Sequence, residues 1–75
     1  MKELIEYIAK SLVDDPSQVE VVETRRSGTV ILTLQVAPED KGRVIGRRGR
    51  VANSMRSLLR VMGSRQGKRV NLEIS

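Results

Sequence analysis

The strict alternation of side chains in TVILTLQVA, residues 29–37, constrains the fold of this chain more than any other feature. The even positions hold one set of aliphatic residues and the odd positions a more mixed set: Val30, Leu32, Leu34 and Val36 against Ile31, Thr33, Gln35 and Ala37. A period of two is typical of a half-buried β-strand, because successive side chains point to opposite faces of a sheet. One strand cannot bury its own apolar face, so the rest of the chain must supply neighbouring strands and a covering layer.

The segment before this strand supplies a helix and a second strand. Apolar residues recur every three or four positions from Leu4 to Val13, as in an amphipathic helix. The helix is expected to stop at Asp14-Asp15-Pro16, because the residue before a proline disfavours the α conformation. QVEVVETRR, residues 18–26, is predicted to be a strand, and a turn at Ser27-Gly28 would join it to residues 29–37 as a hairpin.

The segment after the strand supplies two more helices and a last strand. PEDKGRVI, residues 38–45, is predicted as a short helix that Gly46 ends, because proline suits the first helical position and acids suit the positive end of a helix. Apolar positions from Val51 to Met62 predict a second amphipathic helix that stops at Gly63. SRQGK, residues 64–68, is expected to be a linker, and RVNLEIS, residues 69–75, a strand.

The predicted order is therefore α-β-β-α-α-β within one domain, residues 1–75. Because the three strands must present one face to the helices, we expect an α+β fold with two layers. In this fold a three-stranded sheet is covered on one face by three helices.

Composition excludes several classes of function. The chain has no cysteine and no histidine, which removes thiolate metal sites and the commonest general base. A phosphate-binding loop for hydrolysis would need lysine and then serine or threonine after its second glycine, whereas Arg50 and Val51 follow Gly49 here. We therefore expect no enzyme, no metal and no cofactor. The start lacks the apolar core of a signal peptide and no run is long enough to span a membrane, so a cytoplasmic location without membrane insertion is expected.

Charge is distributed unevenly along the chain. Residues 1–40 hold four basic and eight acidic side chains, which gives −4, whereas residues 41–75 hold ten basic side chains against Glu73, which gives +9. A surface without a charged partner would mix the two signs. The asymmetry favours a polyanion as the partner of the second half, with nucleic acid ahead of an anionic membrane surface.

VIGRRGR, residues 44–50, contains two glycines that bracket two arginines between the predicted helices. Glycine tolerates strained backbone dihedrals and lets another chain approach closely. The N–H groups of Gly49, Arg50 and Val51 would lie among the unpaired donors of a helix N-terminus, and Arg47 and Arg48 could donate to phosphate oxygens. The spacing alone favours a tight connector between two helices, and at this point both interpretations stay open.

The run GRVIGRRGRVANSMRSLLR, residues 42–60, resembles the KH domain, a family that binds RNA and single-stranded nucleic acid. It matches the apolar-Ile-Gly-x-x-Gly signature of that family between two helices. The element order resembles the bacterial, type II arrangement over essentially the whole chain, as in small bacterial proteins that consist of one KH domain. The resemblance implies that Gly46, Arg47, Arg48 and Gly49 contact the backbone of about four nucleotides. It also implies a role as a post-transcriptional regulator or RNA chaperone.

The same resemblance implies a groove for the bases beside the loop. Val44, Ile45 and Ala52 are its apolar candidates, and Ile31 and Thr33 could contribute from the second strand. Ala52 stands where many KH domains have a bulky aliphatic residue. Candidates for further contacts with RNA are the polar residues around the loop, Arg43, Arg50, Asn53 and Arg56, whereas core packing or solvation remains the alternative for each. Arg65, Lys68 and Arg69 are expected to extend a general positive field, and Arg60 to share a helix face with Arg56.

A protein-interaction module is the alternative function. Small single-domain members of the KH family are understood to self-associate and to pair with a larger KH-containing protein, which implies a homodimer or such a partner here. Methionines suit adaptable contacts, but Met55 and Met62 are expected to lie mainly in the core. Tyr7 is the only aromatic residue, so a surface that stacks bases on several aromatic rings is not expected.

Overall fold

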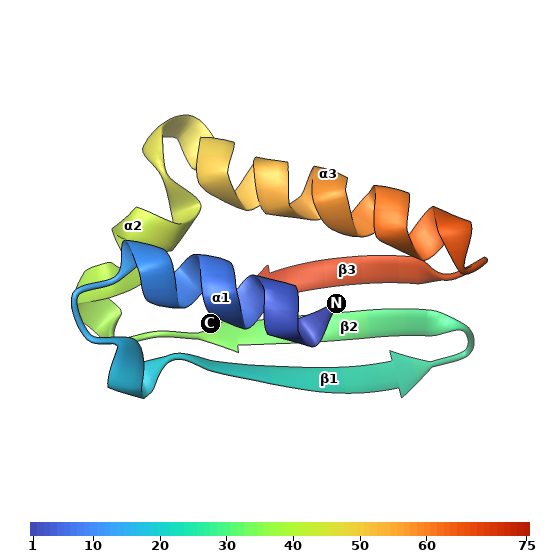
Figure 1. Cartoon of the computed structure of the whole chain (residues 1–75), viewed down its shortest axis with the longest axis horizontal. Coiled ribbons are helices and arrows are strands. Elements are labelled where there is room, and N and C mark those ends of the chain that lie inside the picture. The colour runs from blue at the N-terminus through green and yellow to red at the C-terminus, as the bar shows by residue number, and fades with distance from the viewer.

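The computed structural model of residues 1–75 confirms the predicted order and layers (Figure 1). Its principal elements are α1 (Lys2–Leu12), β1 (Glu20–Arg26), β2 (Thr29–Gln35), α2 (Lys41–Ile45), α3 (Arg50–Arg65) and β3 (Arg69–Ile74). One-turn 3-10 helices lie at Pro16–Gln18, Pro38–Asp40 and Arg47–Gly49. None of the helices is long and apolar enough to cross a membrane.

The sheet has the order β1-β2-β3, so the alternating strand is its centre. β1 and β2 form the predicted antiparallel hairpin, in which Arg26 pairs with Thr29 around the turn. β3 runs parallel to β2, with Thr29 opposite Arg69 and Leu34 opposite Ile74. Because two parallel strands need a long crossover connection, α2 and α3 together carry the chain from the end of β2 back to the start of β3.

The core lies between the helices and one face of the sheet. Val30, Leu32 and Leu34 of β2 are almost fully buried there, as the alternation predicts. The helices contribute Ile5, Val44, Met55 and Leu59, each at most 1% exposed. Ile31 and Thr33 point to the opposite face of the sheet, which no helix covers, and both are half-buried.

Asp40 is a buried carboxylate that joins the start of α2 to the segment after α1. Its two oxygens accept the backbone N–H groups of Asp14 and Asp15, at 3.2 and 3.1 Å. The side chain is 1% exposed, and the guanidinium of Arg43 lies 3.7 Å away. A buried carboxylate is tolerated when it is paired and hydrogen-bonded, so Asp40 fixes the position of α2 against α1.

The predicted end of α3 at Gly63 is wrong, because the helix continues to Arg65 and Gly63 is buried within it. A Cβ at Gly63 would lie 2.7 Å from the carbonyl oxygen of Lys68 and 2.8 Å from Val70, so this glycine permits close approach of β3. The glycine that terminates the helix is instead Gly67, two residues after Arg65, with φ of +67°. The Lys68 N–H donates to the Gly63 carbonyl and the Gly67 N–H to the Ser64 carbonyl, the pattern of a Schellman cap. Residues 64–68 are therefore a helix end and a tight turn, and not a linker.

Candidate nucleic-acid interface

The glycine loop is a tight turn between α2 and α3 that is stabilised by its own backbone hydrogen bonds. Gly46 ends α2 with φ of +77° and ψ of +173°, and its N–H donates to the Gly42 carbonyl at 2.9 Å. A Cβ at Gly46 would lie 2.6 Å from the Val51 side chain, so only glycine fits there. Arg48 has φ of +57°, a left-handed conformation that turns the chain at the tip of the loop.

Two of the three backbone N–H groups that were expected to meet an anion are bonded within the loop, contrary to the sequence prediction. The Gly49 N–H donates to the Gly46 carbonyl at 3.2 Å, and the Arg50 N–H donates to the Arg47 carbonyl. The short 3-10 turn therefore uses the N–H groups of Gly49 and Arg50, which were expected to meet an anion. What the loop offers to solvent instead is the pair of side chains of Arg47 and Arg48, both exposed.

The other predicted site residues differ in how exposed they are and in which residues they contact. Ile45, beside the loop, is 38% exposed, whereas Val44 and Ala52 are at most 2% exposed and belong to the core. Arg50 and Asn53 are exposed on the first turns of α3, and Asn53 accepts a hydrogen bond from Arg56 at 3.3 Å. The bases of a bound strand could therefore reach Ile45 but not Ala52.

Arg43 lies on α2 but is engaged by acidic residues. Its Nη2 lies 3.1 Å from a carboxylate oxygen of Asp14, and its Nε lies 3.7 Å from Asp40. The sequence could not show this, because Asp14 is distant along the chain. Arg43 therefore differs from Arg47 and Arg48, neither of which is in an ion pair.

Arg56 connects α3 to the edge of the sheet. Its Nε and Nη2 both donate to the carbonyl oxygen of Leu72 in β3, each at 3.3 Å. Because β3 has a neighbouring strand on one side only, this carbonyl would otherwise be unpaired at the sheet edge. Arg56 thus fixes the spacing between α3 and β3.

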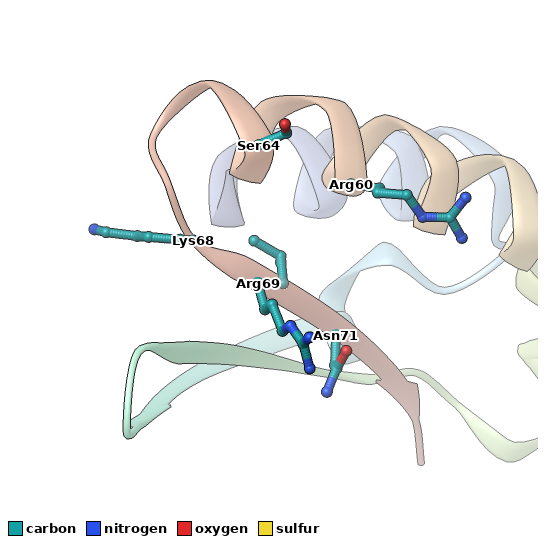
Figure 2. Close-up of a pocket in the computed structure, with 6 residues that line it drawn as sticks. Arg60, Ser64, Lys68, Arg69 and Asn71 are labelled. Atoms are coloured by element: carbon teal, nitrogen blue, oxygen red, sulfur yellow. The ribbon is translucent and has the colours of Figure 1, made fainter.

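A groove follows the seam between α3 and the outer edge of β3, and sequence reasoning, which expected a groove beside the loop, missed its lining residues on β3. Its proximal hollow, nearer the glycine loop, has a volume of about 330 Å³ and is lined by Arg56, Arg60, Val70, Asn71, Leu72 and Glu73. Its distal hollow, of about 410 Å³, is lined by Arg60, Ser64, Lys68, Arg69, Val70 and Asn71 (Figure 2). The strand beside the loop helices is therefore β3, and Ile31 and Thr33 of β2 do not line the groove. The pairing of β3, which places it at this edge, was not predicted.

The basic side chains of residues 41–75 form almost no ion pairs with acidic side chains of the protein. Of the ten basic side chains in residues 41–75, only Arg43 is in an ion pair. In the acidic half, by contrast, Lys2 pairs with Glu6 and Arg25 with Glu23. The loop, α3 and β3 therefore carry a positive charge that the protein itself does not compensate.

Residues 2–74 match a protein-family model described as KhpA/KhpB, KH domain. A protein named RNA-binding protein KhpA from Clostridium acetobutylicum is 49% identical over 74 residues, which cover 99% of each chain. A protein of the same name from Aquifex aeolicus is 43% identical and is matched over 94% of its length.

Among solved structures, the fold is similar to part of Era. A crystal structure of Era in complex with MgGDPNP and a segment of 16S ribosomal RNA matches with a TM-score of 0.55 and 17% identity. The match covers 97% of this chain and 28% of that one. A structure of Aquifex aeolicus Era bound to GDP and aluminium fluoride gives a TM-score of 0.54 at the same identity. At this identity the likeness concerns the fold alone.

Proposed function

Because this chain belongs to the KhpA/KhpB family of KH domains, we propose that it binds single-stranded RNA and clamps a short stretch with its G-R-R-G loop. The family is not enzymatic, which agrees with the sequence prediction. Relatives of nearly equal length carry the name RNA-binding protein, which supports RNA over DNA as the ligand. The proposed role is that of a post-transcriptional regulator or RNA chaperone.

The observation that carries the proposal is the uncompensated charge of the loop and its surroundings. Arg47 and Arg48 are exposed, adjacent and free of carboxylate partners, so each can donate to a phosphate oxygen without first breaking an ion pair. Gly46 and Gly49 carry no side chains that would obstruct the approach of a phosphodiester backbone. Contacts to phosphates would supply most of the affinity and would weaken as salt rises.

Base contacts would come from the groove beside the loop. Ile45 offers an exposed apolar surface next to Gly46, and the proximal hollow along β3 offers polar groups of Asn71 and Glu73. Arg50, Asn53 and Arg56 line the approach on α3. Arg43 would contribute by holding α2 in place through Asp14 and Asp40, and would reach RNA only by exchanging those partners.

Replacing Arg47 and Arg48 with aspartate tests the clamp. The double variant should lower RNA affinity at least about tenfold, because two charge-assisted contacts are replaced by repulsion. Aspartate tolerates the left-handed conformation at position 48, so the fold should persist. A filter-binding titration measures the affinity, and circular dichroism checks the fold.

The chain offers a matched control in Arg25 and Arg26, a second pair of adjacent arginines at the end of the edge strand β1. Replacing this pair with aspartate changes the net charge equally but lies across the sheet from β3. It should leave affinity within about twofold, since exposed charges far from the ligand are screened. An equal loss in both double variants would show that only net charge matters and would reject the clamp.

The alternative is a protein-interaction module that forms a homodimer or pairs with a KhpB-like protein. A specific observation favours a contact surface on α3, where Leu58 is 48% and Val61 55% exposed. Size-exclusion chromatography with light scattering, with and without RNase, separates the two functions. A dimer that persists after RNase and dissociates on Leu58→Gln with Val61→Gln would support this alternative. A monomer under both conditions would argue against homodimerisation.

A further inference from the structure

The distal hollow of the α3–β3 groove lies beyond the part of the protein that the proposed clamp uses. It begins where the proximal hollow ends, because the two share Arg60, Val70 and Asn71. It then continues to the turn at the C-terminal end of α3, where Ser64 and Lys68 line it. One continuous groove thus runs from the half of α3 that follows the glycine loop to the opposite end of the helix.

The distal hollow is lined by cations from three different places. Arg60 comes from α3, Lys68 from the turn and Arg69 from β3, and no acidic residue lines this hollow. None of the three is in an ion pair. In Figure 2, Arg60 extends along the helix toward its N-terminal end, whereas Lys68 projects from the turn in the opposite direction. Arg69 points away from α3 in the same view. The three charges therefore lie apart around the edge of β3, which suits an extended polyanion better than a single small anion.

The floor of the distal hollow offers unpaired backbone groups. The Ser75 N–H donates to Leu34, so the alternate residues Asn71 and Glu73 direct their backbone groups to β2. Val70 and Leu72 direct theirs to the outer edge, as the bond from Arg56 to the Leu72 carbonyl shows. Arg56 occupies that carbonyl, but the N–H and carbonyl of Val70 remain available in the distal hollow. A nucleotide could therefore find both a donor and an acceptor there.

We infer that the distal hollow is a second RNA subsite, which binds the sugar-phosphate backbone of nucleotides adjoining those held by the glycine loop. The inference rests on the proposed function. It assigns a defined role to Lys68 and Arg69, with Arg60 between the two subsites. Its consequence is that the chain holds a longer stretch of RNA than the roughly four nucleotides that a GXXG loop clamps.

The test compares RNA length in the protein and three double variants. Pools of random-sequence RNA of about five nucleotides, near the clamp length, and of roughly three times that length are titrated by fluorescence anisotropy. Lys68→Gln with Arg69→Gln should weaken the long pool about fivefold and the short pool less than about twofold, because each exposed charge contact is worth at most a few-fold. Over a salt series, the slope of log affinity against log salt for the long pool should fall by about 1.4, since each phosphate contact to a single strand contributes about 0.7.

Two further variants control for charge and for fold. Lys10→Gln with Arg25→Gln removes the same two side-chain types from α1 and β1 and should change neither affinity. Lys68→Gln with Arg69→Lys retains the charge on β3 and should recover part of the loss for the long pool. Melting curves that coincide with that of the unchanged protein verify that each variant is folded.

The outcomes separate the subsite from the proposed function. If the unchanged protein binds neither pool, the proposed function itself is rejected. A second outcome is that the unchanged protein binds both pools while Lys68→Gln with Arg69→Gln leaves affinity unchanged or lowers it equally for the two pools. That result overturns the subsite and leaves the proposed clamp in place. A loss confined to the long pool supports the subsite.

Discussion

The arginines of the basic half differ in what their guanidinium groups contact, although the sequence presents them alike. Arg43 is held by carboxylates, and Arg56 is held by a backbone carbonyl at the sheet edge. Arg47 and Arg48 have no such partner, although they lie only a few residues from Arg43 along the chain. The difference follows from contacts between distant segments, so residue type and spacing could not reveal it.

Gly42 and Gly46 in the α2 region allow a prediction at the scale of single residues, because only at Gly46 is glycine sterically required. Gly46 has dihedrals that are almost exclusive to glycine, and a Cβ there would lie 2.9 Å from the backbone nitrogen of Val51. Gly46→Ala should therefore destabilise the protein by about 3 kcal/mol, from strain and from the clash. Urea unfolding followed by circular dichroism measures the loss.

Gly42→Ala is the matched control for this substitution. Gly42 lies within α2, and nothing is within 4 Å of the position that its Cβ would occupy. Because alanine is a better helix former than glycine, this change should stabilise the protein by up to about 1 kcal/mol. The steric account of the loop fails if the two substitutions shift the unfolding midpoint in the same direction.

At the scale of elements, the sequence predicted what local periodicity encodes. The alternation over residues 29–37 and the apolar stripes of α1 and α3 each have a direct physical cause, and all three elements are present. The position of Gly46 and Gly49 between two helices was also predicted, because glycines end helices in a recognisable way.

Features that depend on contacts between elements were not predicted. Gly63 has the sequence signature of a helix end, but its role is to let Lys68 and Val70 approach the helix. The same limit applies to the groove, because its walls meet only after β3 pairs with β2 and Arg56 reaches Leu72. Ala52 is a third example, since its place in the core depends on the rotation of α3 over the sheet.

At the scale of the whole molecule, the fold gathers the positive charge of the second half of the chain on one side of the sheet. β1 and β3 form opposite edges of the sheet. α1, from the acidic half, packs on β1 and β2, whereas α3, from the basic half, packs along β3 (Figure 1). An approaching polyanion is therefore attracted to the α3–β3 side, whereas α1 and β1 each carry two basic and two acidic side chains and exert no net attraction. This orientation brings both the loop and the groove toward the ligand.

The position of the loop and the groove on one side of the molecule predicts which amides respond when RNA binds. In a titration followed by two-dimensional NMR, shifts should concentrate in residues 45–60 and along β3, since the loop and the groove lie there. The strand β1 should shift little, because it forms the edge of the sheet opposite β3. Val22 and Thr24, on the uncovered face of β1, serve as the internal control. If their amides shifted most, RNA would be binding across the open sheet, and the assignment of the loop and groove as the interface would be wrong.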